Sequence, residues 1–116
     1  MPFSTKRIQH ITILVITYNR KDDLRVCLDS LADQNYSSYE TVVVDNASTD
    51  GTATMIREEY DWINYVQLDE NIGIDARNRG FDEATGDLVL TLDDDSELPN
   101  DNVLTRVADV FERNDE

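Results

Sequence analysis

Three consecutive aspartates, Asp93, Asp94 and Asp95, directly follow the apolar run from Leu88 to Leu92. The apolar run can bury itself as a strand, but adjacent carboxylates need a cation, hydrogen-bond donors or bulk water. Residues at positions i and i+2 of an extended or turning segment can converge on one ligand. Asp93 and Asp95 therefore suit a hard divalent cation that also bridges to phosphate oxygens. The alternative for the triplet is a solvated acidic loop.

Polar segments also follow the three other strands that the sequence predicts, at residues 17–20, 45–51 and 69–73. In an open parallel sheet, ligands bind outside the carboxyl ends of the strands, so these segments and the aspartates are expected to form one site. Ordinary polar loops are the alternative, because loops at both ends of a sheet face water.

The spacing of glycines after the first strand limits the ways in which this site could hold a diphosphate. The first strand is followed neither by G-x-G-x-x-G nor by G-x-x-x-x-G-K-[ST], so no backbone cradle for a diphosphate is predicted and a cation is the remaining means of holding one. Arg77 could add charge-assisted hydrogen bonds to the same phosphates, or form a surface ion pair. Asp45 could accept from a ring N–H of a base, or cap the turn that follows it.

Hydrophobic periodicity predicts the elements that position these residues. Strands are predicted at residues 11–17, 40–45, 64–68 and 87–92, and helices at 21–33, 53–60, 72–84 and 102–112. This alternation implies parallel pairing through right-handed crossovers. The predicted fold class is α/β: a Rossmann-like, open, mainly parallel sheet of about four strands with helices on both faces. The third strand is the least apolar and is expected nearer the edge.

Chain length and net charge limit the possible functions. The chain has 116 residues, enough for a single domain, and a formal net charge of −15 that disfavours binding to nucleic acid. Lysine occurs only at positions 6 and 21 and most acidic residues are aspartate, which indicates an acidic surface suited to a salt-rich cytoplasm. No run approaches the ~18 apolar residues of a membrane span, so a cytoplasmic location is expected. The only cysteine, Cys27, and the only histidine, His10, are expected to be packing or surface residues.

Four motifs in order resemble the inverting glycosyltransferases of family 2, which have a GT-A fold. They are VITYNR (residues 15–20), VVVDNASTDGT (42–52), ENIGIDARNRGFDEATGD (70–87) and LTLDDDSELP (90–99). The resemblance covers essentially the whole chain from Ile11 to about Phe111. Each motif is weak alone, but four with this spacing are highly specific.

The resemblance implies a role for individual residues. Thr17, Tyr18 and Asn19 resemble the loop that lines base and ribose, and Asp45 the carboxylate that accepts from a pyrimidine N3–H. Asp93 and Asp95 match the DxD pair that binds ribose and Mn²⁺ or Mg²⁺, although Asp94 leaves the register of that pair open by one residue. The nucleotide-sugar-binding residues are thus expected to be Thr17, Tyr18, Asn19, Arg20, Asp45, Asn46, Ser48, Asp50, Arg77, Asn78, Asp93 and Asp94, and the metal ligands Asp93 and Asp95.

The implied reaction is a single displacement at the anomeric carbon of a UDP-, dTDP- or GDP-linked sugar, with inversion. The cation neutralises charge on the leaving diphosphate, and a carboxylate base deprotonates the acceptor hydroxyl. That base lies in the family's second half, so no catalytic residue is assigned and the chain is expected to be a donor-binding half that does not transfer alone.

The expected acceptor is a glycan, a lipid or a cell-envelope precursor bound by a C-terminal part outside this sequence. That part could also hold the enzyme at the inner face of a membrane. Without it the fourth strand would expose a hydrogen-bonding edge and favour oligomers. The alternative function is a non-catalytic module that binds a nucleotide or a partner.

Overall fold

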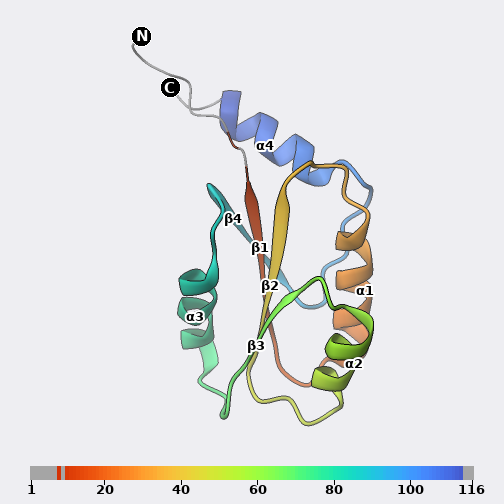
Figure 1. Cartoon of the computed structure of the whole chain (residues 1–116), viewed down its shortest axis with the longest axis vertical. Helices are drawn as coiled ribbons and strands as arrows, with labels where there is room; N and C mark the ends of the chain where they lie inside the picture. Colours follow the sequence, from red (N-terminus) through yellow and green to blue (C-terminus); the bar gives the residue numbers. More distant parts are fainter. Residues whose placement is uncertain (1–7, 9, 114–116) are drawn as a thin grey trace.

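The computed structural model of the chain describes residue 8 and residues 10–113, which form a four-stranded sheet flanked by helices (Figure 1). The strands are β1 (Ile11–Thr17), β2 (Tyr39–Asp45), β3 (Asn64–Gln67) and β4 (Leu88–Asp93). The helices are α1 (Lys21–Ala32), α2 (Thr52–Glu59), α3 (Ala76–Glu83) and α4 (Val103–Arg113), and a 3-10 turn η1 (Gly73–Asp75) precedes α3. The predicted α/β fold class is confirmed.

All strand pairs are parallel, and their order is β3-β2-β1-β4. β1 lies inside the sheet, and its residues Ile11 to Val15 are buried, as its nearly continuous apolar run predicts for a strand covered on both faces. β3 and β4 form the two edges of the described sheet, which confirms the edge position predicted for β3.

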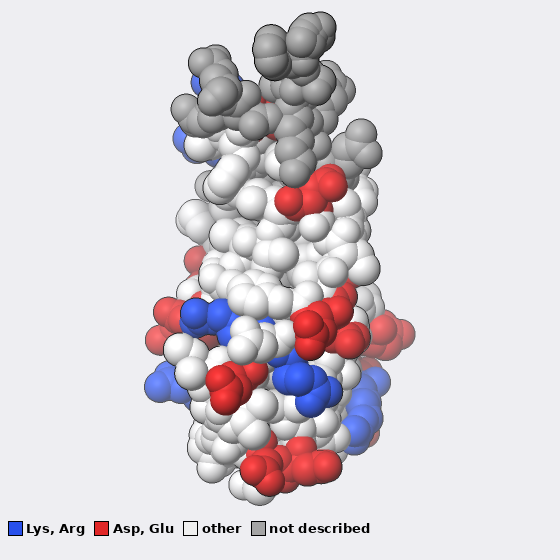
Figure 2. Space-filling model, turned by 90° about the vertical axis from the view of Figure 1, so that its left-hand side faces the viewer, with Lys and Arg blue, Asp and Glu red and all other residues white. Residues whose placement is uncertain are grey.

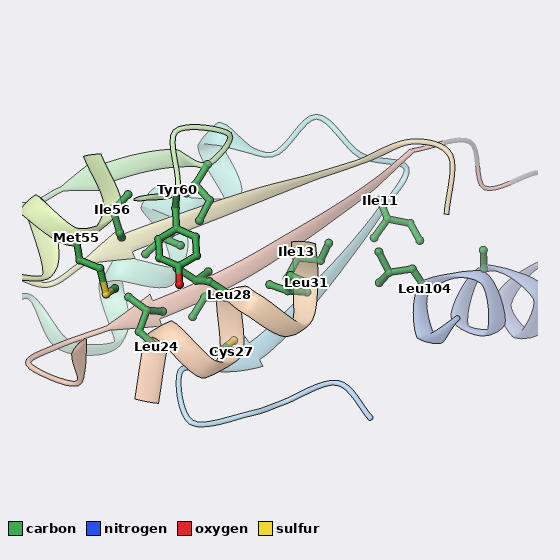
Figure 3. Packing of buried hydrophobic residues seen from close by; sticks show 14 residues of the cluster. Ile11, Ile13, Leu24, Cys27, Leu28, Leu31, Met55, Ile56, Tyr60 and Leu104 are labelled. Carbon is green, nitrogen blue, oxygen red and sulfur yellow. The ribbon is translucent and has the colours of Figure 1, made fainter. Parts of the chain in front are cut away.

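Helices cover both faces of the sheet (Figure 1). On one face, α1, α2 and α4 pack against β1 and β2, with the α1 stripe of Leu24, Cys27, Leu28 and Leu31 fully buried (Figure 3). On the other face, α3 approaches β1 so closely that a Cβ added to Gly80 would lie 2.2 Å from Cδ1 of Leu14. The absence of a side chain at Gly80 thus allows α3 to pack closely against β1.

The helix predicted from Ile72 begins only at Ala76. Gly73 adopts a left-handed φ of +62°, which is incompatible with a continuous α-helix, and the amide of Ile72 donates to Oδ1 of Asn46 at 3.1 Å. The start of α3 is therefore set by a contact with the loop after β2 and not by helix propensity.

α4 crosses the end of the sheet where β1 begins, and Leu104 packs near Ile11 (Figures 1 and 3). Its first turn is capped from a distance, because Oε1 of Gln34 accepts from the amide of Leu104 at 3.1 Å. The amide group of Gln34 also donates to the carbonyl of Asn100 at 2.7 Å. Within the residues that the structure describes, no helix combines the length and the apolar character that a membrane span requires.

A carboxylate ties three segments together at this amino end of the sheet. Oε2 of Glu40 accepts hydrogen bonds from the Thr12 hydroxyl and from both the amide and the hydroxyl of Thr85, at 2.7 and 2.9 Å for the latter two. Burial alone would raise the pKa of Glu40, but the hydrogen bonds from Thr12 and Thr85 outweigh burial and hold that pKa below its ordinary value. The ionised carboxylate therefore stabilises the fold.

Replacing this carboxylate by an amide, Glu40→Gln, should lower the free energy of unfolding at pH 7 by about 1–2 kcal/mol, because charge-assisted hydrogen bonds are lost. A carboxyl whose pKa falls on folding stabilises the protein above its unfolded pKa and loses that effect as the pH drops through the folded pKa. In urea unfolding, the difference between wild type and variant should be complete above about pH 5 and shrink toward about pH 3. Equal losses in Glu40→Gln and in Glu58→Gln, an exposed position outside this cluster, would contradict the assignment.

Two residues other than glycine have a positive φ, Asn19 at 50° and Ala47 at 69°, within the part of the chain that the structure describes. Both lie in loops that follow the carboxyl end of a strand, β1 for Asn19 and β2 for Ala47. Alanine has no side-chain hydrogen bond to offset the left-handed conformation, which costs roughly 1–2 kcal/mol relative to the right-handed one. The loop after β2 is thus held in its shape by its surroundings.

The substitution Ala47→Gly should raise the free energy of unfolding by about 0.5–1 kcal/mol, because glycine relieves the left-handed strain by more than its greater freedom in the unfolded chain costs. Chemical denaturation monitored by circular dichroism measures the change. The matched control is Ala53→Gly in α2, where the same substitution should lower stability. A loss at position 47 as well would show that Ala47 is not strained.

Candidate functional site

The polar segments that follow the strands meet at the carboxyl edge of the sheet, at the bottom of Figure 1. The register places Thr17 of β1 opposite Asp45 of β2, and Ile16 of β1 opposite Asp93 of β4. The predicted convergence of these segments is therefore what the structure shows.

Hydrogen bonds fasten the loop after β1 to the loop after β2. The amide of Asn19 donates to Oγ of Ser48 at 2.8 Å, and the amide of Thr49 donates to Oδ1 of Asn19 at 2.7 Å. The amide of Lys21 donates to Oδ2 of Asp50 at 3.0 Å. Asn19, Ser48 and Asp50, which the sequence predicts as ligand contacts, thus all take part in joining the two loops: Asn19 binds Ser48 and Thr49, and Asp50 binds Lys21.

Asp50 is also bonded within its own loop. Its Oδ1 accepts from the amide and the hydroxyl of Thr52, at 3.2 and 2.6 Å. Burial would raise the pKa of Asp50, but the hydrogen bonds from Thr52 and Lys21 outweigh it and lower that pKa. Asp50 therefore stays ionised and fixes the beginning of α2 relative to the beginning of α1.

Asp45 is fully buried, with an exposed fraction of 0%. Its Oδ1 accepts from the amide of Ser48 at 2.9 Å, and its Oδ2 accepts from the hydroxyl of Tyr65 in β3. Burial, followed by this bond to Asp45, raises the pKa of Tyr65 well above its ordinary value. Asp45 thus caps the turn, which the sequence offers as its alternative role, and its contact with a nucleotide base stays a prediction.

Asn46 is 5% exposed and bridges the loop after β2 to the segment before α3. Its carboxamide accepts from the amide of Ile72 at 3.1 Å and donates to the carbonyl of Gly73 at 3.2 Å. Thr17 is likewise only 1% exposed. Three residues predicted to line the nucleotide, Thr17, Asp45 and Asn46, thus face the protein, because side chains at the ends of these strands point into the sheet and its loops.

The three aspartates after β4 occupy different environments. A hydrogen bond from the amide of Ser96 to the carbonyl of Asp93, at 3.0 Å, closes the turn. Asp93 and Asp95 are exposed, and neither carboxylate has a hydrogen bond or an ion pair to residue 8 or residues 10–113. Asp94 is 9% exposed, and its Oδ2 accepts from the hydroxyl of Thr17 at 2.9 Å. Burial raises the pKa of Asp94, and the bond from Thr17 offsets this only in part.

Several predicted contacts do face solvent. Tyr18 is 47% exposed, and Arg77 and Asn78 lie on the exposed surface of α3. Figure 2 shows the side of the molecule that α3 covers, where lysine and arginine side chains lie among aspartates and glutamates in the lower half. The structure shows no contact between Arg77 and the aspartates after β4 within the described residues.

An open hollow of about 700 Å³ lies beside the loop after β1, lined by Asn19, Arg20, Lys21, Asp22, Asp23 and Asp50. Nε of Arg20 lies 3.9 Å from Oδ1 of Asp94, and its Nη1 lies 3.4 Å from Oδ2 of Asp23. Arg20 therefore connects this hollow to the turn after β4.

Sequence reasoning did not identify Tyr65 or the backbone of residues 72–73 as partners of Asp45 and Asn46. The contact between the Tyr65 hydroxyl and Asp45 follows from the pairing of β3 with β2. Tyr65 lies opposite Val43, and Val43 and Asp45 point to the same face of the sheet because they are two residues apart. No local pattern in the sequence carries that information, since it depends on register between strands far apart in the chain.

Comparison with known proteins gives one family. The family model described as glycosyl transferase family 2 matches residues 12–116. Glycosyltransferase GlyA of Streptococcus pneumoniae is 38% identical over 106 residues, which are 88% of this chain and 15% of GlyA. The putative teichuronic acid biosynthesis glycosyltransferase TuaG of Bacillus subtilis is 32% identical over 107 residues, which are 89% of this chain and 42% of TuaG. The chain thus spans less than half the length of these curated relatives.

Solved structures agree with the sequence relatives. TarS of Staphylococcus aureus superposes with a TM-score of 0.80 at 31% identity, over 90% of this chain and 20% of TarS. The mannosyltransferase PcManGT of Pyrobaculum calidifontis, in complex with GDP-Man and Mn²⁺, superposes with a TM-score of 0.79 at 33% identity, over 96% of this chain and 34% of PcManGT. With its parallel sheet, its helices on both faces and the polar loops at its carboxyl edge, the chain belongs to glycosyltransferase family 2.

Proposed function

We propose that this chain is the donor-binding part of a metal-assisted, inverting glycosyltransferase and binds a nucleoside-diphosphate sugar at the carboxyl edge of its sheet. The observation that carries the proposal is the pair Asp93 and Asp95, which are exposed at the end of β4 without a protein partner among the described residues. The structural relatives support it, since PcManGT is described with GDP-Man and Mn²⁺, and TarS with UDP and with UDP-GlcNAc.

The donor set of the turn fits a hard divalent cation. Mg²⁺ and Mn²⁺ are commonly held by one or two carboxylates together with waters and substrate phosphates, and the described residues contain no group of three metal-ligating side chains that would form a closed cage. Asp93 and Asp95 would hold the cation. When bound, it would supply charge neutralisation on the departing nucleoside diphosphate.

The protein's own side chains would position the rest of the donor. Tyr18 offers an exposed ring to a base, on a loop held in place by hydrogen bonds from the amides of Asn19 and Lys21 to Ser48 and Asp50. Arg77 and Asn78 present exposed donors on α3, suited to diphosphate oxygens. Arg20 lies next to the same turn and adds a second cationic group.

We further propose that a hexosyl group is transferred to a glycan, a lipid or a cell-envelope precursor on the cytoplasmic side. The name of TuaG, a protein of teichuronic acid biosynthesis, supports an acceptor of this kind. The general base and the acceptor site would belong to a part outside residues 1–116, so this segment alone should bind the donor without transferring its sugar. The edge of β4 would be available for pairing with another strand.

Metal-dependent nucleotide binding is the central prediction. UDP, dTDP or GDP, or their sugar conjugates, should raise the melting temperature by several degrees when MnCl₂ is present, as expected for a ligand at about a hundred times its Kd. The variant Asp95→Ala should abolish the part of this shift that depends on Mn²⁺, because one of two ligand carboxylates is lost. A thermal-shift panel of the three nucleotides with and without MnCl₂ measures both effects.

The matched control for this panel is Asp61→Ala, which removes an exposed aspartate of the loop between α2 and β3 and should leave every shift unchanged. Absence of any shift with all three nucleotides would overturn the proposed function. Transfer of a sugar to water or to an added acceptor by this segment alone would overturn the assignment of the base to another part.

We also propose that the strongly acidic surface is suited to a salt-rich medium. With a net charge of −15, screening of repulsion between like charges should stabilise the folded chain. The melting temperature should therefore rise between about 0.1 M and about 1 M KCl, where the screening length falls from about 10 Å to about 3 Å. A midpoint that stays constant over this range would contradict the proposal.

A further inference from the structure

We propose that Asp94 is a positioning residue that fastens the turn after β4 to the end of β1 and thereby couples cation binding to nucleotide binding. This inference rests on the proposed function and concerns the same site. It gives the middle aspartate a role distinct from that of Asp93 and Asp95.

Burial separates Asp94 from its neighbours. Asp94 is 9% exposed and Thr17 is 1% exposed, whereas Asp93 and Asp95 are both exposed. The Thr17 hydroxyl donates to Oδ2 of Asp94 at 2.9 Å across two adjacent parallel strands. A buried carboxylate needs such a donor, so this bond fixes the direction in which Asp94 points.

The second oxygen of Asp94 faces the loop after β1. Nε of Arg20 lies 3.9 Å from Oδ1 of Asp94, so the carboxylate contacts both the last residue of β1 and the residue before α1. The other charged groups near it, Asp95 and Asp23, are acidic and do not compete for the role of partner. The turn after β4 is therefore connected to the protein through Asp94.

This connection orients the neighbouring carboxylates. The turn is closed by the bond from the amide of Ser96 to the carbonyl of Asp93, so the backbone on both sides of Asp94 is constrained. Anchoring Asp94 inward leaves Asp93 at the strand end and Asp95 after it in the solvent. Both carboxylates are then accessible from solvent to an incoming cation, and the anchored backbone limits the reorganisation that binding requires.

The same connection reaches the loop that carries Tyr18. That loop starts at Thr17 and is fastened to Ser48 and Asp50. The Thr17–Asp94 bond therefore joins the loop with Tyr18, which would contact the base, to the turn with Asp93 and Asp95, which would hold the cation. A nucleotide that orders the loop after β1 would also order the turn after β4. Mn²⁺ and a nucleoside diphosphate should therefore bind with positive coupling.

Titration calorimetry of UDP and of GDP, each with and without MnCl₂, tests this role in four variants. Thr17→Val removes the donor and keeps the side-chain shape, and should weaken Mn²⁺-dependent nucleotide binding by about tenfold or more, the effect of one lost hydrogen bond to a charged group. Thr17→Ser restores the donor and should recover most of the affinity. Asp94→Asn keeps an acceptor oxygen and should retain Mn²⁺ dependence, whereas Asp95→Ala should lose it. The loss in Thr17→Val should be larger with Mn²⁺ than without it, because the bond acts on the coupling, and the control Asp61→Ala should bind like the wild type in both conditions.

The rival role for Asp94 is that of a cation ligand. Under that role Asp94→Asn would lose Mn²⁺ dependence as Asp95→Ala does, and Thr17→Val would bind like the wild type, a pair of results that would overturn the positioning role. Equal weakening with and without Mn²⁺ in Thr17→Val would also overturn it, since the coupling would be unaffected. A wild-type chain that binds neither nucleotide under any condition would instead remove the proposed function itself. Urea unfolding of each variant, with Thr17→Ser as the structural control, shows whether a loss of binding reflects a loss of folding.

Discussion

In-register parallel pairing of β1 with β2 on one side and β4 on the other is the constraint on which the rest of the structure depends. It places the last residues of three strands at one level, so that Thr17, Asp45 and Asp93 end at the same edge. A shift of one residue in either pairing would turn every side chain of that strand to the opposite face. The continuous apolar character of β1 and the packing of α1 and α3 on opposite faces hold this register in place.

Polar residues at the carboxyl edge divide into two groups with different tasks. Asp45, Asn46 and Asp94 point into the protein, and they and the partly buried Asp50 satisfy amides and hydroxyls that loop formation would otherwise leave without partners. Tyr18, Arg77, Asp93 and Asp95 point outward. The side chains that bond within the protein make the loops rigid, and rigid loops hold the solvent-facing side chains near one another.

Much of the fold follows from the sequence because hydrophobic periodicity is local. The run from Ile11 to Thr17 and the stripe of Leu24, Cys27, Leu28 and Leu31 contain their own evidence for a strand and a helix, and both were predicted within one residue. The start of α3 could not be predicted in this way, because the amide of Ile72 is taken by Asn46 from another loop. The same is true of the cap that Gln34 provides to α4.

The candidate site shows the same limit at the level of single side chains. Position at a strand end predicts that Asp45 and Asp94 belong to the site, but not whether their carboxylates face inward or outward. That choice depends on Tyr65 and Thr17, which are 20 and 77 residues away in the chain. Motif matching therefore places Asp45, Asp93 and Asp94 together among the nucleotide-sugar-binding residues, whereas in the structure Asp45 and Asp94 are buried and Asp93 is exposed.

The end of the sheet opposite the site has a consequence for how the molecule can be handled. The amide of Ile8 donates to Oε2 of Glu112 at 2.7 Å, so the beginning of β1 and the end of α4 lie side by side, far from the loops that follow the strands (Figure 1). Segments that meet in this way tolerate being joined by a short linker and reopened elsewhere. A circular permutant opened at the exposed Ser37, which is also at this end, would keep all the loops of the carboxyl edge intact. A carrier or a surface attached there would leave that edge free.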